Sequence, residues 1–357
     1  SVDNYSDVLV ARNFMYTDAE GWIISSSHRV VFTENHCNSS TSDGSHGNTL
    51  GSYHPPARLD DVLISRNQIV NQGTTMDGPG QQWNPQWATP NASLGYFGGA
   101  RIASSVDDRG TVVIELTGGH EGSSSGSGIL KAAALYEGMG LAVMQGSGVE
   151  QIRRVVSVQT GTRRLTLERP FDVAIDNSSV VALTLFRHRV AVVGNSFTTK
   201  LHDIAFWVYG GCSECIVSAN VAEGPGPNST SFGMGLWPRS IHGLIEPVHR
   251  TEFQDNFAIN FGSVGLIGGL ENYLALLRNC TLASARSIVL RRNQVRGGTL
   301  QVSMTPLNGK GQFYGLIGGV LEDNSVVEGT QASPVISIAN SSLRLTVRGN
   351  RCNGAPC

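Results

Sequence analysis

Six acidic and imidazole side chains stand where the chain is polar and rich in glycine, and their types could carry out proton transfer. Carboxyl and imidazole groups are common general acids and bases, and they lie most often on loops beside a rigid scaffold. Their separation in the sequence leaves open whether they meet in the fold. The candidates for catalysis are Asp43, His46, His54, Asp60, His120 and Glu121.

Six cysteines are present, and four of them form two close pairs. An even number is typical of an oxidising compartment, so we expect local disulfides between Cys212 and Cys215 and between Cys352 and Cys357. The Cys-x-x-Cys spacing also occurs in zinc and redox sites. Those sites need a second pair or a βαβ setting that this sequence lacks, so we predict no bound metal.

Seven tripeptides match the acceptor pattern for N-glycosylation. If they are used, the chain passes through a eukaryotic secretory route and carries N-linked glycans on its surface. We therefore predict an extracellular, secreted location. The acceptors are Asn4, Asn38, Asn91, Asn177, Asn228, Asn279 and Asn340.

The elements that position these residues are predicted by a nine-residue phrase, which occurs nine times in the sequence, each time around an asparagine. The residue three before the Asn is apolar in every copy, and the residue five before it is mostly apolar. Both therefore face one side of a strand. We predict that the Asn itself turns the chain, because Asn tolerates the left-handed backbone conformation. The turn residues are Asn13, Asn35, Asn67, Asn195, Asn220, Asn256, Asn293, Asn324 and Asn350.

Charged residues stand at two fixed places in the phrase and alternate in sign from copy to copy. Six residues before the Asn, the first three copies carry Asp7, Arg29 and Asp61. One residue before it, the signs alternate in the opposite phase. Strands stacked about 4.8 Å apart would pair these charges, although each exposed pair contributes at most about 1 kcal/mol. The pattern predicts directly stacked copies and a structural role for Asp61.

Strand-and-turn units at intervals of 22 to 37 residues are typical of a solenoid, here a parallel β-helix. The phrase is missing for 128 residues, from Asn67 to Asn195. Within that interval, two alternating runs around 159–162 predict a hairpin. We expect β-helix rungs at 1–72, a lateral loop and an inserted β-subdomain at 73–187, and further rungs at 188–357.

The phrase resembles the right-handed parallel β-helix superfamily, the pectate-lyase-like fold, over about 1–72 and 188–357. The resemblance implies an all-β, right-handed solenoid. It does not choose a function, because that fold carries lyases, hydrolases, epimerases, phage spikes and surface fibres. A glycoside hydrolase on this fold would need paired carboxyl groups. A polysaccharide lyase would need a base and a group that neutralises the uronate, often a calcium ion.

The amino-acid composition indicates which classes of partner are not expected. Charged residues make up 15% of the chain and the net charge is −2, so a nucleic-acid partner is not expected. No apolar run reaches the ~18 residues of a membrane span. The chain does not begin with Met, and we expect a mature product or a piece of a longer protein. We expect no cofactor, with calcium as the exception if the chain is a lyase.

We predict a secreted, N-glycosylated module that acts as a structural or interaction component of an extracellular fibre, coat or matrix. The alternative is a carbohydrate-active enzyme, either a polysaccharide lyase or a glycoside hydrolase. The ends of a solenoid expose unpaired strand groups. The expected partners are therefore copies of this chain or other chains at those ends, besides N-linked glycans and, in the alternative, a polysaccharide.

Overall fold

The structure is a computed structural model in which part of the chain is described. The described residues are 2–3, 6–17, 22–25, 27–39, 50–51, 58–71, 100–104, 111–116, 137–159, 164–176, 178–184, 186–199, 205–209, 212–226, 232–241, 244–270, 285–304, 316–328, 336–338 and 343–357.

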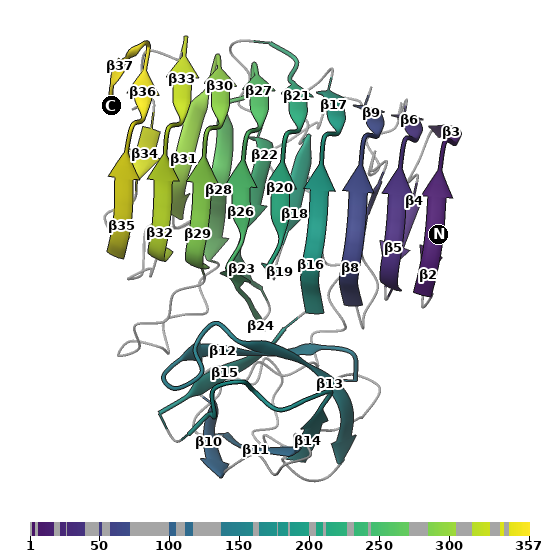
Figure 1. Cartoon of the computed structure of the whole chain (residues 1–357), viewed down its shortest axis with the longest axis vertical. Coiled ribbons are helices and arrows are strands. Elements are labelled where there is room, and N and C mark those ends of the chain that lie inside the picture. Colours follow the sequence, from purple (N-terminus) through teal and green to yellow (C-terminus); the bar gives the residue numbers. More distant parts are fainter. Residues whose placement is uncertain are drawn as a thin grey trace.

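Parallel sheets run along the length of the molecule, and successive turns of the chain add strands to them in order (Figure 1). Sheet 1 holds the strands that lead into the asparagines, paired in register from turn to turn. Its strands are β2 Ser6–Ala11, β5 Ser27–Thr33, β8 Arg58–Ser65, β16 Phe186–Val193, β19 Cys212–Ser213, β20 Ile216–Ser218, β25 Val248–His249, β26 Glu252–Gln254, β29 Ala285–Arg291, β32 Leu316–Glu322 and β35 Leu343–Arg348.

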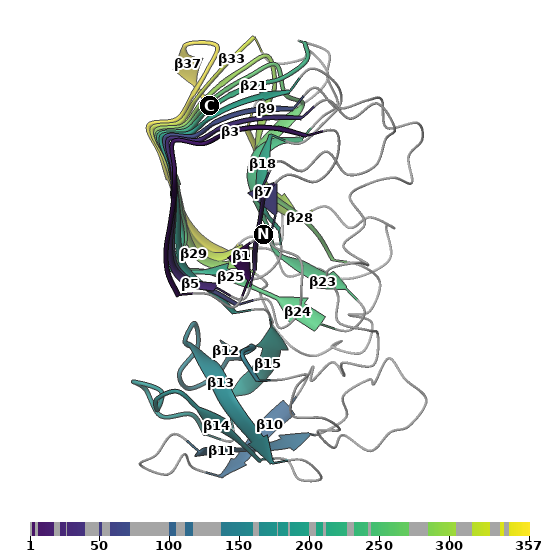
Figure 2. The same ribbon diagram turned by 90° about the vertical axis from the view of Figure 1, so that its right-hand side faces the viewer.

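Sheets 2 and 3 complete the wall of the solenoid, which is seen end-on in Figure 2. Sheet 2 follows each asparagine and contains β3 Phe14–Thr17, β6 His36–Ser39, β9 Gln68–Asn71, β17 Ser196–Thr199, β21 Val221–Glu223, β27 Phe257–Ile259, β30 Gln294–Arg296, β33 Ser325–Val327, β36 Arg351–Cys352 and β37 Ala355–Pro356. Sheet 3 contains β18 Phe206–Tyr209, β22 Phe232–Trp237, β23 Arg239–Ile241, β24 Leu244–Glu246, β28 Ser263–Leu270, β31 Thr299–Met304 and β34 Ile336–Ile338, and a short sheet joins β1 Val2–Asp3, β4 Trp22–Ser25 and β7 Leu50–Gly51.

The asparagines form a continuous ladder at the corner between sheets 1 and 2. From Asn13 to Asn324, each side-chain amide donates to the Oδ1 of the asparagine on the next rung at 2.9 to 3.0 Å. The backbone N–H of the same residue donates to the same oxygen. The polar groups of the corner therefore form hydrogen bonds with one another, although the ladder asparagines are buried from Asn35 onward.

The prediction that the asparagine itself takes the left-handed conformation is wrong. The residue before it does so in every copy, with φ between 50° and 66°, and none of the nine ladder asparagines has a positive φ. The reason is that the Asn side chain must point into the corner to bond its neighbours, so the residue before it absorbs the turn. The left-handed residues are Arg12, Glu34, Arg66, Gly194, Ala219, Asp255, Arg292, Asp323 and Gly349.

The predicted charge pairs are present on the surface of the stacked rungs. Arg12 and Glu34 lie 2.8 Å apart, and Glu34 also contacts Arg66 at 3.0 Å. Asp255 and Arg292 lie 2.7 Å apart. These pairs are exposed, so their contribution to stability is small, but they fix the register that the sequence predicts.

The interior is lined by the apolar positions of the phrase. Val30, Phe32 and Cys37 are fully buried in one rung, and equivalent side chains stack above them along the axis. At the C-terminal end, β37 folds back antiparallel on β36. The predicted Cys352–Cys357 disulfide closes this hairpin, and the predicted Cys212–Cys215 disulfide is also present.

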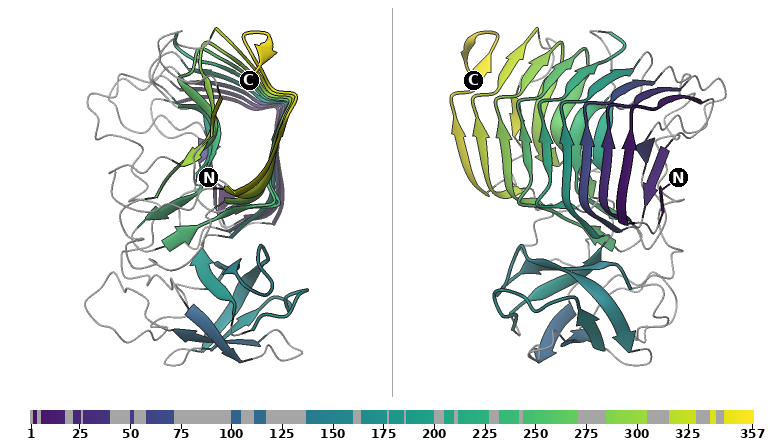
Figure 3. Two further views of the ribbon diagram at one scale, coloured as in Figure 1. Left: turned by 90° about the vertical axis from the view of Figure 1, so that its left-hand side faces the viewer. Right: turned by 45° about the vertical axis from the view of Figure 1, so that its right-hand side comes forward.

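The inserted segment forms a closed antiparallel β-barrel beside the solenoid (Figure 3). The predicted hairpin is the pair β13–β14. The barrel strands are β10 Ala100–Ser104, β11 Thr111–Leu116, β12 Gly140–Gln145, β13 Ile152–Gln159, β14 Arg164–Leu167 and β15 Val180–Thr184.

The solenoid is a parallel β-helix, as predicted, because parallel strands of successive turns stack in register around one apolar interior. Its right-handed sense follows the rule for connections between parallel strands of one sheet. Among the described residues, no helix has the length and apolar content that crossing a membrane requires.

Candidate functional site

A column of polar residues runs along the lower edge of sheet 1, seven positions before each of the first seven ladder asparagines, and Ile317 and Leu343 take this position on the last two rungs. Equivalent residues of a parallel sheet point to the same side, about 4.8 Å apart, so their side chains can meet. The barrel lies beside this edge (Figure 1). In register order the column is Ser6, His28, Asp60, His188, Ser213, His249 and Arg286.

Asp60 is the centre of the first part of the column. Its side chain is 7% exposed, with Oδ1 3.1 Å from His188 Nδ1 and Oδ2 3.3 Å from His28 Nδ1. Arg189 Nη2 lies 3.4 Å from Oδ1. Burial raises the pKa of Asp60, but the hydrogen bond from His188 and the positive charges of His188, Arg189 and His28 outweigh burial and hold it below the usual value. Asp60 is therefore a buried carboxylate that its basic neighbours keep ionised and hold in place.

His188 connects Asp60 to a carboxylate at the surface. Its Nε2 lies 3.3 Å from Glu214 Oε2, while its Nδ1 faces Asp60. Glu214 is 44% exposed and lies 3.7 Å from Arg250. A buried carboxylate that orients an imidazole, with an exposed carboxylate at the other ring nitrogen, is an arrangement that can move a proton.

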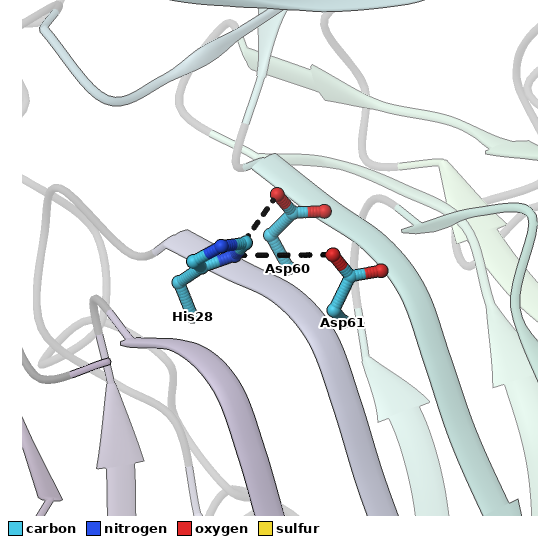
Figure 4. Close-up of side chains that lie close together, drawn as sticks. All are labelled: His28, Asp60 and Asp61. Carbon is cyan, nitrogen blue, oxygen red and sulfur yellow. Dashed lines mark ion pairs between the residues drawn. The ribbon is translucent and has the colours of Figure 1, made fainter. Parts of the chain in front are cut away.

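His28, Asp60 and Asp61 have ligand atoms within 4.8 Å of one another (Figure 4). Calcium prefers six to eight oxygen ligands, whereas this cluster offers two carboxylates and an imidazole. Arg189 contacts Asp61 at 2.6 Å and also reaches Asp60, and Arg29 donates to His28 Nε2. These guanidinium groups already neutralise the carboxylates, so the residues do not fit a calcium ion.

Most of the catalytic candidates from the sequence lie outside the described residues. Asp60 is the described one, and Asp43, His46, His54, His120 and Glu121 are not described. The sequence did not predict that His28, His188 and Arg189 contact Asp60, or that Glu214 contacts His188. The signal was present, because counting seven residues back from each of the first seven asparagines, rather than six, gives the whole polar column.

One of the glycan acceptors lies within the described residues. Asn38 is half-buried in β6, which pairs with β3 on one side and β9 on the other. The remaining acceptors, and Cys280, lie outside the described part of the chain. Use of these acceptors stays a prediction.

The barrel contacts the solenoid through Glu150, which precedes β13. Glu150 Oε1 accepts a hydrogen bond from Ser287 Oγ at 2.8 Å, and Oε2 lies 3.3 Å from Arg250 Nε. Both partners belong to the edge of sheet 1 that also carries His249 and Arg286. This junction therefore places the barrel beside the second half of the polar column.

No protein-family model matches the chain, and no curated protein matches it by sequence. Among solved structures, it is similar to the tailspike gp61 of Pseudomonas phage phi297, with 11% identity and a TM-score of 0.24, covering 92% of this chain and 66% of that one. It is also similar to the Gp54 tailspike of Acinetobacter baumannii bacteriophage AP22, solved in complex with A. baumannii capsular saccharide, with 8% identity and a TM-score of 0.19.

The second match covers 95% of this chain and 64% of the tailspike, so the chain spans about two thirds of the length of both. Similarity at this level carries no argument about function. The β-helix assignment depends on the strand pairing of the chain itself.

Proposed function

We propose that this chain is a structural and interaction module, a β-helical rod that associates with copies of itself in an extracellular fibre, coat or matrix. Secretion and N-linked glycans belong to this proposal. The support comes from the outer face of sheet 1 and from the carboxyl groups of the described residues.

The outer face of sheet 1 carries a stripe of apolar side chains along the axis of the rod, four residues before the asparagines. Leu9 is 68% exposed and Ile216 is 39% exposed, and the others are half-buried. Monomeric proteins seldom expose long apolar patches, which mark interaction sites. This outer stripe consists of Leu9, Val31, Leu63, Ala191, Ile216, Val289 and Val320, interrupted by Glu252.

A second copy of the chain is the partner that this face fits best. In Figure 2 no described strand lies outside sheet 1. Charges that alternate along the axis flank the outer stripe, for example Asp7, Arg29 and Asp61. A copy displaced by one rung would therefore place opposite charges beside each other, with apolar side chains meeting between them.

The carboxyl groups favour this function over glycoside hydrolysis. A hydrolase needs one carboxyl group whose pKa is raised, so that it can protonate the leaving oxygen. Among the described carboxyl groups with a shifted pKa, every shift is downward, through arginine partners in most cases. The second candidate, a carbohydrate-active enzyme acting on a polysaccharide, is supported by the arrangement of Asp60, His188 and Glu214.

Analytical ultracentrifugation of the whole chain tests the proposal. We expect concentration-dependent association, which Ile216→Lys should abolish by placing a charge in the outer stripe. Val221→Lys is the matched control, because Val221 is a similarly exposed apolar residue, at 44%, on the outer face of sheet 2 in the same rung. A monomer at every concentration would refute self-association, and equal effects of both variants would refute the assignment to sheet 1. Cleavage of a polysaccharide by the wild type, lost in Glu214→Gln, would favour the enzyme instead.

A further inference from the structure

The second half of the polar column differs from the first, because His249 and Arg286 form no ion pair among the described residues, whereas His28 and His188 both contact Asp60. Ser213, His249 and Arg286 occupy equivalent positions on three successive rungs. Ser213 Oγ, His249 Nε2 and Arg286 Nε are buried and have no hydrogen-bond partner among the residues that the structure describes. Such atoms are rare in native proteins, since a buried polar group without a partner loses its hydrogen bonds to water and gains none in return.

His249 is a neutral imidazole in the folded protein. It is 1% exposed, and burial, followed by the positive charges of Arg286 and Arg250, lowers its pKa to about 3. His188, two rungs earlier in the same column, instead has carboxylates at both nitrogens. A neutral imidazole has one N–H donor, and in the tautomer with the proton on Nε2 the unpartnered nitrogen of His249 is that donor.

The junction also has more positive charge than the described carboxylates neutralise. Arg286 is partly buried, and burial is the main reason that its pKa is lowered, with Arg344 adding to this and Glu150 opposing it. Glu150 is already engaged by Arg250 and Ser287. No ion pair of Arg286 is present among the described residues. Arg250 and Arg286 therefore lie near Glu150, and Arg344 lies near Arg286. Arg250 has a second carboxylate, Glu214, at 3.7 Å.

We propose that Ser213, His249 and Arg286 form a binding site for an oxyanion, such as a phosphate group or the carboxylate of a sugar acid. The Ser213 hydroxyl and the His249 Nε2–H donate hydrogen bonds to its oxygens. The guanidinium of Arg286 donates a charge-assisted hydrogen bond and supplies the countercharge. The site lies beside the contacts of Glu150 with Arg250 and Ser287, where the barrel meets sheet 1. This inference is independent of self-association.

Two probes test the site in the whole chain at pH 7.5 and constant ionic strength: inorganic phosphate and sodium glucuronate, with chloride as the reference. We expect at least one probe to bind saturably in titration calorimetry and to raise the melting temperature. Arg286→Gln and Ser213→Ala should each weaken binding at least tenfold. Arg351→Gln is the matched control, because it removes one exposed arginine from sheet 2 and should bind as the wild type does.

Each outcome decides the proposal. Phosphate binding alone identifies a phosphate site, and glucuronate binding alone identifies a sugar-acid site. The inference is overturned if neither probe binds saturably, or if Arg286→Gln and Ser213→Ala bind as tightly as the wild type. Ser213→Ala removes one hydroxyl oxygen, and its native circular dichroism spectrum separates lost binding from lost folding. Without ligand, Arg286→Gln should melt no lower than the wild type, because it removes a partly buried charge that forms no ion pair with the described residues.

Discussion

Replacing Asn220 by Ala should be among the most destabilising single substitutions in the asparagine ladder. Asn220 is fully buried in the middle of the solenoid. Its amide donates to Asn256 Oδ1 at 3.0 Å and to the carbonyl of Val192 at 2.8 Å. Its Oδ1 accepts from the backbone N–H and the side-chain amide of Asn195, both at 3.0 Å. The substitution removes all four hydrogen bonds and leaves their partners inside a dry corner.

At about 1 kcal/mol for each net hydrogen bond, four lost bonds correspond to about 4 kcal/mol. Asn13→Ala is the matched control, because Asn13 is the exposed first member of the ladder and its side chain donates to Asn35 Oδ1 and the Ala11 carbonyl. We expect a loss of less than about 1 kcal/mol there, since water can replace exposed partners. Guanidinium unfolding followed by circular dichroism measures both values. Equal losses in the two variants, or a loss below about 1 kcal/mol in Asn220→Ala, would refute the ladder as a source of stability.

Two further predictions concern the polar column. Asp60→Asn should cost about 3 kcal/mol at pH 7, because it leaves His28, His188 and Arg189 without their buried carboxylate, whereas Asp255→Asn breaks an exposed pair and should cost under about 1 kcal/mol. The folded-state pKa of Asp60 is lowered, so its contribution is present above the ordinary value near 4 and is lost as the pH falls further. Denaturant unfolding should therefore show Asp60→Asn and the wild type converging in acid, and a constant difference would contradict this assignment. His249 has its pKa lowered to about 3, so the unfolded chain binds a proton below about pH 6.5 that the folded chain does not. Wild-type stability should fall by up to about 1.4 kcal/mol per pH unit from there toward pH 3. His249→Gln should remove that slope between pH 6.5 and 5, and parallel curves for the two proteins would show that His249 is not buried in the neutral form.

Much of the fold was predictable because every turn of a solenoid repeats the same local strand-and-turn structure. The apolar positions around Asn35 and Asn67 had to face one interior, and the signs at Asp7, Arg29 and Asp61 could pair only if the rungs stack in register. The ladder itself was less visible. An asparagine at a corner suggests a turn residue, and only the stacking of identical side chains shows why the preceding residue, such as Glu34, takes the left-handed conformation instead.

The site was harder to predict for a physical reason. Its members come from separate rungs, so Asp60 and His188 stand 128 residues apart in sequence although they are neighbours in the sheet. The inserted barrel causes that separation, and its closure depends on pairings between distant strands such as β10 and β15. Short runs of alternating apolar and polar residues predict a hairpin well. They do not determine which strands far apart in the sequence pair with each other.

The polar column shows where a stacked sheet leaves buried donors without acceptors among the described residues. Each rung contacts its neighbours above and below, so a column is stable when adjacent side chains complement one another. Asp60 satisfies this rule between His28 and His188. Ser213, His249 and Arg286 do not, because a hydroxyl, a neutral imidazole and a guanidinium bring no carboxylate to the group, and Glu150 from the barrel is held by Arg250 and Ser287. A missing acceptor between rungs that are otherwise complementary is the feature that an oxyanion would complete, and it stands where the regular β-helix meets its irregular insertion.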